Sequence, residues 1–473
     1  MESISAFEMI KVGIGPSSSH TMGPWRAAEM FIETLTEKNL LVSTVQLKVE
    51  LFGSLAKTGV GHGTDIAVLL GLDGEDYTKI DTSLVDEKIA HIKAEKKIHL
   101  GGQHWIAFDY EEDLIFHFDE SLAFHPNGIR FSAWQADESC HREEYFSVGG
   151  GFVVQEDHVD AKIQRKVTPY PCHNGETIQR NCETMNLSMS ELVFLNEQTW
   201  RTKEEINAQC LTIWEEIKSC IWRGTHREGI LPGGLNVKRK AAEINRKLLA
   251  DRPYSNREEW IEAIKSTGTN FTNINKWISC FALAVNEENA SFGRIITAPT
   301  NGASGVLPAV LMYAYCFGDD FNEKKIVRFI ITAGEIGTLF KKNATISAAM
   351  GGCQAEIGVS SSMSAAGLTE VMGGSVGQVL MAAEIAMEHH LGMTCDPIGG
   401  LVQVPCIERN SMGAIKAITA SNIALESDPE AARVSLDEVI KSMWETALDM
   451  NSKYKETSEG GLAVNISVGL AEC

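Results

Sequence analysis

Three cysteines in the second half of the chain occupy positions that suit metal binding. Cys353 stands in AAMGGCQAEIG, while Cys395 and Cys406 stand in TCDPIGGLVQVPC, with 41 and then 10 residues between successive members. Each lies beside glycine, threonine or proline and not deep inside a helical pattern. Thiolates are soft ligands for zinc or iron–sulfur clusters, and three of them on a four-iron cluster leave one iron open for Lewis-acid chemistry. The spacing alone leaves zinc, a cluster and chance occurrence open.

The other cysteines favour no disulfide framework. The total of eleven is odd, the chain shows no secretion signal, and no CxxC pair indicates a zinc ribbon or a thioredoxin-like site. Most cysteines of this kind are small buried hydrophobic residues. We expect that of Cys140, Cys172, Cys182, Cys210, Cys220, Cys280 and Cys316. The chain stops on one more thiol, Cys473, in the tail GLAEC.

Three loops rich in glycine and hydroxyl residues each lead into a helical pattern. In GIGPSSSHTMGP (13–24), hydroxyls stand just before a helix, whose free N–H groups favour an anion. The alternative is a flexible turn or a helix cap. The candidate ligand-binding residues of this loop are Ser17, Ser18, Ser19, His20 and Thr21.

The second and third loops offer a base and further donors. His62 in KTGVGHGTDIAV is flanked by glycines and is a candidate general base, since histidine titrates near neutrality; the alternative is a solvated histidine in a tight turn. In TAPTNGASGVLPAV, the amides and the side chains of Asn301 and Ser304 are suited to a carboxylate, although this pattern is weak by itself.

Composition and charge exclude several classes of protein. The net charge of −21 argues against a nucleic-acid partner, because no basic stripe exists to displace counterions. No apolar run reaches the roughly 18 residues that a membrane span needs, and the first residues do not resemble a signal peptide. We expect a soluble, cytoplasmic protein that binds an anionic small molecule through local donors or a metal.

Hydrophobic periodicity predicts two regions. Residues 1–155 are expected to form an α+β domain, with strands in 44–55, in 104–118 around an acidic turn, in NGIRFSAW and in EEYFSVGGGFVV, and helices over 24–39 and 65–72. Residues 156–175 are polar and are the candidate linker. Residues 176–473 are expected to be all-helical, starting with a capping box at 188–191, and segments such as GSVGQVLMAAEIAMEHH predict helices that are buried nearly all round.

Five motifs in this order resemble a known family. KVGIGPSSSHTMGP, GHGTD, APTNGASG, GGCQAEIGVSSSMSAAG and CDPIGGLVQVPCIERN together are similar to the bacterial iron–sulfur-dependent L-serine dehydratases, in the single-chain form that fuses a β-type and an α-type region. Each motif is modest alone, but five in the right order are specific. The resemblance runs from about residue 3 to the end.

The resemblance implies a cofactor and a reaction. It implies a [4Fe–4S] cluster held by Cys353, Cys395 and Cys406, with Cys473 as the fourth ligand of the resting cluster. It also implies conversion of L-serine to pyruvate and ammonia, in amino-acid degradation and gluconeogenesis. Apolar helices make a homodimer plausible.

The chemistry needs a base opposite an iron that binds the leaving hydroxyl. We expect His62 to be that base, with His20 next; His20 could instead pair with the substrate carboxylate alongside its neighbouring hydroxyls. The second-line substrate contacts are Asn301, Gly302 and Ser304. Because the cysteines and the two histidines belong to different regions, the scheme predicts a site between the regions, and it predicts sensitivity to oxygen.

Three alternatives remain open from sequence. A pyridoxal-phosphate dehydratase needs a Schiff-base lysine, and none of the lysines in the weakly charged part stands in a motif typical of that cofactor. These lysines are Lys324, Lys325, Lys341, Lys342 and Lys416. An iron–sulfur small-molecule sensor would use the same loops without catalysis. A related dehydratase could act on another hydroxylated substrate.

Overall fold

A computed structural model describes residues 3–156, 166–250 and 252–466, and the chain divides into two units. The mixed unit comprises Gly13–Ile163 with Phe292–Arg294. The helical unit comprises Met1–Val12, Gln164–Ser291 and Ile295–Cys473. The strands β1 (Lys11–Ile14) and β9 (Arg294–Thr297) pair with one another, and each contains one of the points at which the chain passes from one unit to the other.

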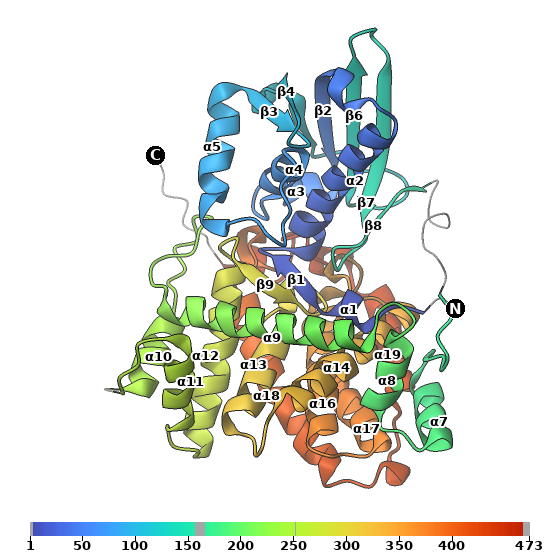
Figure 1. The fold of residues 1–473 in the computed structure, drawn as a ribbon, viewed down its shortest axis with the longest axis vertical. Coiled ribbons are helices and arrows are strands. Elements are labelled where there is room, and N and C mark those ends of the chain that lie inside the picture. The colour runs from blue at the N-terminus through green and yellow to red at the C-terminus, as the bar shows by residue number, and fades with distance from the viewer. Residues whose placement is uncertain (1–2, 157–165, 251, 467–473) are drawn as a thin grey trace. The chain divides into compact units, whose positions relative to one another are not determined.

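The mixed unit is built on a five-stranded sheet in the order β5-β2-β6-β7-β8 (Figure 1). β2 pairs in parallel with β5, and the remaining pairs are antiparallel. A separate antiparallel pair is formed by β3 and β4. The strands are β2 (Thr44–Phe52), β3 (Lys97–Leu100), β4 (His104–Ala107), β5 (Leu114–His117), β6 (Gly128–Gln135), β7 (Cys140–Ser147) and β8 (Val153–Val154).

Helices pack on this sheet through a shared apolar core. The helices are α2 (Gly23–Glu37), α3 (Ser54–Lys57), α4 (Thr64–Leu72), α5 (Val85–Glu95) and α6 (Tyr110–Asp113), and a π-helical turn, η1 (Ser18–Met22), precedes α2. Alternation along β2 buries Leu47, Val49 and Leu51. Phe31 of α2 stacks on Phe131 of β6 with ring centroids 5.0 Å apart. These contacts fix η1 and α4, which carry the first two loops.

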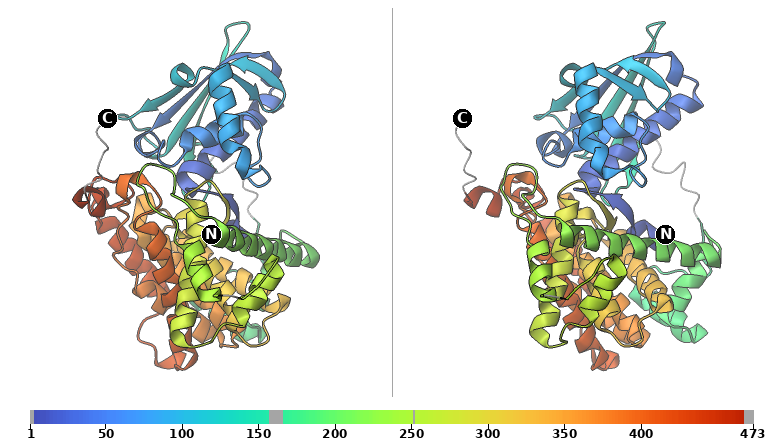
Figure 2. Two further views of the ribbon diagram at one scale, coloured as in Figure 1. Left: turned by 90° about the vertical axis from the view of Figure 1, so that its left-hand side faces the viewer. Right: turned by 60° about the vertical axis from the view of Figure 1, so that its left-hand side comes forward.

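The helical unit is built mainly of α-helices (Figure 2). Its first residues form α1 (Ala6–Met9), which packs on α14. The remaining helices are α7 (Gly175–Met185), α8 (Met189–Glu197), α9 (Lys203–His226), α10 (Ala241–Leu249), α11 (Arg257–Lys265), α12 (Phe271–Asn289), α13 (Val306–Phe317), α14 (Glu323–Asn343), α15 (Ala348–Gly351), α16 (Ile357–Val371), α17 (Val376–Glu388), α18 (Cys406–Leu425), α19 (Leu436–Asp449) and α20 (Leu462–Asn465).

Helix α16 is the centre of the helical unit. Every residue of α16 is buried, and the helix contacts α13, α14, α17 and α18. Small residues permit this packing: a Cβ on Gly367 would lie 2.9 Å from the carbonyl oxygen of Phe329 on α14. Cys353 lies in the turn just before α16, and Cys406 is the first residue of α18, so the packing of the two helices brings these residues near one another.

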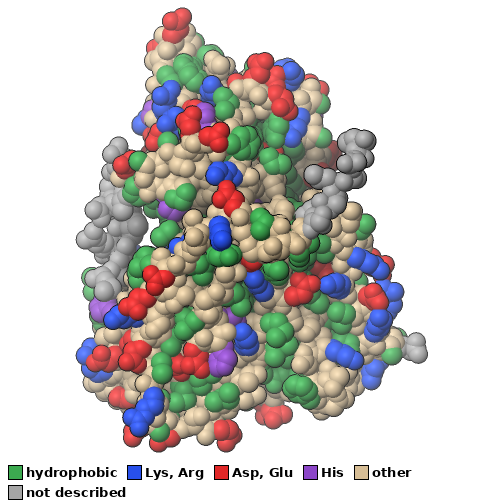
Figure 3. Space-filling model, turned by 180° about the vertical axis from the view of Figure 1, so that it is seen from behind, with side chains coloured by type: hydrophobic (Ala, Val, Ile, Leu, Met, Phe, Trp, Pro, Cys, Tyr) green, Lys and Arg blue, Asp and Glu red, His purple; other side chains and the backbone are tan. Residues whose placement is uncertain are grey.

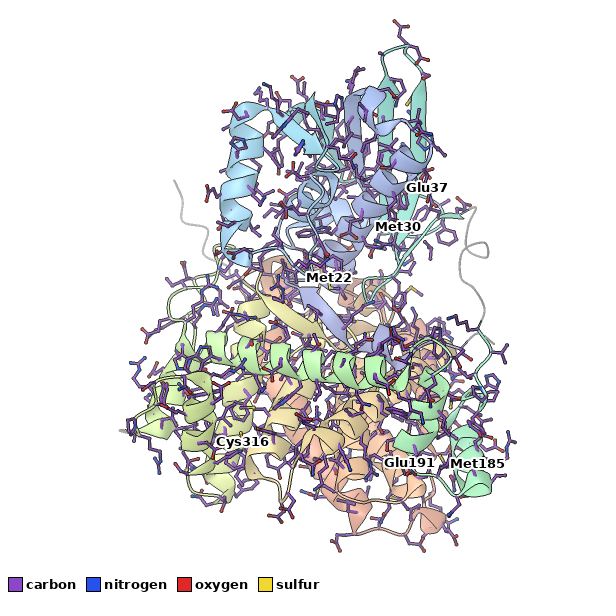
Figure 4. The ribbon with its side chains drawn as sticks, in the orientation of Figure 1. Met22, Met30, Glu37, Met185, Glu191 and Cys316 are labelled. Carbon is purple, nitrogen blue, oxygen red and sulfur yellow. The ribbon has the colours of Figure 1, made fainter. Side chains whose placement is uncertain are left out.

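The predicted fold class is confirmed, an α+β region followed by a mainly α-helical one. The predicted strands and helices of the first 155 residues are present, and the acidic turn within 104–118 is the one-turn helix α6. The capping box joins Ser188, just before α8, to Glu191, which is labelled in Figure 4. The domain boundaries drawn from composition stay a prediction.

Two packing predictions were wrong. Cys140 is exposed, because it starts β7 beside the turn from β6, where the strand pair projects into solvent. The other six cysteines expected to be buried are buried, including Cys316, labelled on α13 in Figure 4. The segment GSVGQVLMAAEIAMEHH forms α17, which keeps partly exposed residues on one side. The helix buried all round is α16.

The surface mixes charges of both signs. On the face drawn in Figure 3, lysine and arginine side chains are interspersed with acidic ones. Within the described parts of the chain, no helix combines the length and the apolar character that crossing a membrane requires.

The close crossing of α9 and α12 gives a test of the packing. A Cβ on Gly224 of α9 would lie 2.3 Å from the carbonyl oxygen of Ala284 on α12. We expect Gly224→Ala to destabilise the protein by about 1–3 kcal/mol, as overpacking does, and to lower the melting temperature. In the control Gly268→Ala, the new Cβ meets its nearest atom at 3.6 Å. Equal melting temperatures for both variants would contradict this packing.

Candidate active site and metal centre

The three candidate ligand cysteines lie on three separate turns that meet in the helical unit. Cys353 lies in the 3₁₀ turn η6 (Gly352–Ala355) just before α16, Cys395 follows α17, and Cys406 is the first residue of α18. All three are buried. The Sγ atoms of Cys353 and Cys395 and a carboxylate oxygen of Glu356 all lie within 4.8 Å of one another. The spacing of 41 residues between Cys353 and Cys395 is therefore closed in the fold. Cys406 is not among these three ligand atoms, but its thiol lies near enough to Cys353 for that charge to raise its pKa.

This cluster of side chains is rich in acidic groups. Burial raises the pKa of the Glu356 carboxyl to about 7 and that of Glu456 well above its usual range. The hydrogen bond with Cys353, together with burial, raises the pKa of the Cys395 thiol well above its ordinary value. For Cys406, burial is the larger cause and the charge of Cys353 adds to it. Five acidic groups thus gather here, four of them buried and Glu356 partly exposed, so solvent stabilises their negative charge poorly.

The donor set fits a metal cluster. Thiolates are the ligands that iron–sulfur clusters take, and a bound cation deprotonates a coordinating thiol outright. A positively charged core would therefore offset the negative charge that burial otherwise disfavours. The side chain of Arg409 contributes one positive charge here, since Nη1 donates a hydrogen bond of 3.3 Å to Cys353 Sγ.

The third loop lies against the same cluster of side chains. A Cβ on Gly302 would lie 2.8 Å from Glu356 Oε2, so a larger residue here would displace the Glu356 carboxylate. Asn410 of α18 holds the loop by donating from Nδ2 to the Gly302 carbonyl, 2.7 Å, and by accepting from the Gly305 amide, 2.9 Å. The buried hydroxyl of Ser304 has no hydrogen-bond partner, so it remains available to a ligand.

Asn301 lies in the same loop but already has a partner. Its Oδ1 accepts a hydrogen bond of 2.6 Å from the Thr297 hydroxyl. The hydroxyl of Thr300, one residue earlier, lies close to the Glu356 carboxyl and opposes the effect of burial on the pKa of that group. The Ser304 hydroxyl stays unsatisfied, which is typical of a site that awaits a polar ligand.

The first two loops meet in the mixed unit. The rings of His20 and His62 lie 4.7 Å apart between centroids. The Thr21 hydroxyl donates to the His62 carbonyl, 2.8 Å, and the Thr64 hydroxyl donates to the His20 carbonyl, 2.6 Å. Each loop therefore fixes the backbone of the histidine that the other loop carries.

The serine run is buried and largely hydrogen-bonded within itself. The Ser17 hydroxyl caps the turn by accepting from the His20 amide, 3.2 Å, and lies 3.3 Å from the Ser19 hydroxyl. Ser18 is buried in the first turn of η1. Met22, labelled in Figure 4, closes η1 and leads into α2.

The two histidines differ in how their ring nitrogens are occupied. His62 Nδ1 lies 3.0 Å from the Thr58 carbonyl oxygen, which can only accept, so Nδ1 carries the proton. Nε2 of His62 is buried and has no partner. In His20, Nδ1 lies 2.8 Å from the Ser19 hydroxyl and Nε2 lies 3.0 Å from the Ser54 hydroxyl. His62 therefore presents an available lone pair.

Burial keeps both rings neutral. It lowers the pKa of His62 to about 4 and that of His20 well below the usual value, with the neighbouring His62 adding to the effect on His20. Gly63 makes the burial possible, because it has φ +61° and a Cβ there would lie 1.9 Å from the ring of Phe292.

The structure adds residues that the sequence reasoning missed. Glu356 and Arg409 stand three residues after Cys353 and Cys406, and Asn410 four after Cys406, so helical spacing within the quoted motifs was an available indication. Glu456 and His125 carry no such pattern. His125 lies near enough to His20 to lower its pKa. Cys473 lies outside the described residues, and its role is untested.

Comparisons with known proteins point to one family. Residues 184–463 match the family model described as "Serine dehydratase alpha chain", and residues 5–158 match "Serine dehydratase beta chain". The chain is 49% identical over 467 residues to an L-serine dehydratase of Streptomyces coelicolor, covering 98% of this chain and 99% of that protein.

Two further relatives give the same result. An L-serine dehydratase of Haemophilus influenzae is 46% identical, with 98% of this chain and 99% of the relative covered. The L-serine dehydratase TdcG of Escherichia coli is 45% identical, with 98% and 100% covered. The similarity therefore extends over both units.

The environment of His62 predicts a pH effect on stability. The unfolded chain protonates this histidine near pH 6.5, whereas the folded protein does so near pH 4. Stability is therefore fully present above about pH 6.5 and is lost as the pH falls toward 4. We expect the melting temperature of His62→Gln to fall less steeply over that window than the wild type.

The matched control for this measurement is His91→Gln, which changes an exposed histidine of α5 and should keep the wild-type slope. A slope for His62→Gln equal to that of the wild type would show that His62 does not resist protonation.

Proposed function

The chain belongs to the serine dehydratase family, and on that premise we propose that it converts L-serine to pyruvate and ammonia with a [4Fe–4S] cluster held by Cys353, Cys395 and Cys406. The observations that carry the proposal are the approach of Cys353 Sγ, Cys395 Sγ and a Glu356 carboxylate oxygen to within 4.8 Å of one another, and the hydrogen bond from Arg409 to Cys353. The buried thiol of Cys406 lies near enough to Cys353 to feel its charge. When bound, the cluster supplies an open iron as a Lewis acid for the departing hydroxyl.

His62 is the proposed base for the Cα proton. The support is its tautomer, because the Nδ1 proton is committed to the Thr58 carbonyl and Nε2 keeps its lone pair. Its lowered pKa keeps it neutral at physiological pH. His20, whose two ring nitrogens both face hydroxyls, is proposed to orient the serine run and is the second candidate for the base.

The glycine and hydroxyl loops are proposed to bind the substrate. Ser17, Ser18, Ser19 and Thr21 offer hydroxyls and amides at the start of a helical turn, where an anion is favoured. In the third loop, Gly302 and Asn301 shape the backbone, and the unpartnered hydroxyl of Ser304 is a donor for a carboxylate. That both regions contribute to one site stays a prediction.

Loss of water from L-serine leaves 2-aminoacrylate. This product rearranges to the imine, which water hydrolyses to pyruvate and ammonia without further catalytic groups. The chain therefore needs to assist only removal of the Cα proton and departure of the hydroxyl.

We also propose that Cys473 is the fourth ligand of the resting cluster and that the protein acts as a homodimer. The support for the first is the family resemblance. The support for the second is the expectation that the apolar helices of the sequence make a dimer plausible.

Replacement of one ligand cysteine tests the cluster. We expect Cys353→Ala, reconstituted without oxygen, to lose cluster absorbance and bound iron and to lower pyruvate release at least about 100-fold, since even residues behind metal ligands are worth 10–100-fold. Cys316→Ala is the matched control, because Cys316 is also buried but lies on α13. An active Cys353→Ala enzyme without iron would refute the scheme.

Replacement of the base is the second test. We expect His62→Gln to lower kcat by about 10²–10⁴-fold, the usual contribution of a general base, with bound iron unchanged. His20→Gln is measured alongside. A larger fall in kcat for His20→Gln than for His62→Gln would move the base to His20.

A further inference from the structure

The side chain of Arg409 links Cys353 to the loop that carries Cys395. Its Nη1 donates to Cys353 Sγ, 3.3 Å, and to the carbonyl oxygen of Thr394, 2.6 Å. Its Nη2 donates to Asp396 Oδ1, 3.1 Å. These three hydrogen bonds fix the orientation of the planar guanidinium group. A lysine ammonium could not make the same set of hydrogen bonds. The charge of Cys353 in turn raises the pKa of Arg409, despite burial.

Asp396 contacts both Arg409 and the last helix of the described chain, α20. It is buried, and its Oδ2 accepts a hydrogen bond of 2.8 Å from the backbone amide of Leu462, the first residue of α20. The preceding residue, Gly461, has φ +59°, and a Cβ there would lie 2.1 Å from Asp396 Oδ2. Glycine is needed at this position for both reasons.

The whole C-terminal strap, residues 454–465, is attached to the Cys395 loop. The Cys395 amide donates to the Tyr454 carbonyl, 2.8 Å, and the Glu456 amide donates to the Cys395 carbonyl, 2.9 Å. The Ser458 hydroxyl donates to the Pro397 carbonyl, 2.9 Å. Successive residues of the ligand loop thus hold successive parts of the strap.

We propose that Arg409 and Asp396 are positioning residues that couple the Cys353 ligand to the docking of the C-terminal strap. Arg409 donates a hydrogen bond to the sulfur of Cys353 and partly neutralises its negative charge. Asp396 accepts hydrogen bonds from Arg409 and from the strap. Loading the cluster and docking the strap then stabilise one another. This inference rests on the proposed cluster and extends it to residues outside the ligand set.

The physical consequence differs between the two residues. Removing the cation of Arg409 leaves more negative charge on the cluster, which disfavours the reduced form and shifts its midpoint potential to a more negative value. Removing the negative charge of Asp396 weakens the anchor of the strap. A protein in which these side chains served stability alone would show neither the shift in potential nor local release of the strap.

The test uses the full chain loaded with its cluster without oxygen. The midpoint potential of the cluster is measured with dithionite as reductant, and iron release to a chelator is followed. Trypsin cleavage after Lys453 and Lys455, which flank the start of the strap, reports docking. We expect Arg409→Gln to shift the potential to a more negative value and to release iron about 10–100-fold faster. Arg409→Lys keeps the charge, so it should keep the potential but still release iron faster.

For the strap, we expect Asp396→Asn and Gly461→Ala to be cleaved several-fold faster than the wild type, and removal of the cluster from the wild type to accelerate cleavage as well. Gly373→Ala is the matched control, since Gly373 also has a positive φ but no atom within 4 Å of its Cβ position. Arg328→Gln, which breaks an ion pair with Glu370 on α16, controls for loss of an arginine.

The outcomes separate the two proposals. Wild-type protein that binds no cluster would overturn the proposed function. A cluster in the wild type with an unchanged potential in Arg409→Gln, or cleavage of Asp396→Asn at the wild-type rate, would overturn the coupling and leave the function standing.

Discussion

The burial of acidic groups around Cys353 is the constraint on which the helical unit depends. Three thiols and the carboxyl of Glu456 are buried, the carboxyl of Glu356 is only partly exposed, and the charge of Arg409 balances one of these groups. Such an arrangement is costly unless protons or a metal supply positive charge. The packing of α16, α17 and α18 imposes the arrangement, so the energy of the fold holds the ligands together in advance of any metal.

In the mixed unit, burial likewise sets the protonation state of a functional side chain, here the imidazole of His62. His62 is buried, and its Nδ1 has a single acceptor, which leaves Nε2 unprotonated with its lone pair available. Glycine at position 63 allows the ring of Phe292 to cover the turn. In both units, therefore, glycines let the backbone approach closely, and burial sets the protonation state of the side chains that carry chemistry.

Much of this was predictable from residue patterns. Alternation in β2, the capping box of α8 and the three loops before helices are local features that short-range physics determines. The meeting of Cys353 with Glu356 and Arg409 depends on tertiary packing, and Glu456 reaches the site through a chain segment with no pattern of its own. Cys140 was assigned wrongly because the end of a strand pair, unlike its middle, is open to solvent.

Pyruvate release from L-serine, by wild-type protein loaded with its cluster without oxygen, tests the central claim most directly. The account predicts steady release of pyruvate with bound iron present, and loss of that release together with iron when the same sample is exposed to air. Protein with a confirmed cluster that releases no pyruvate, or protein that releases pyruvate at the same rate after its iron is lost, would contradict it.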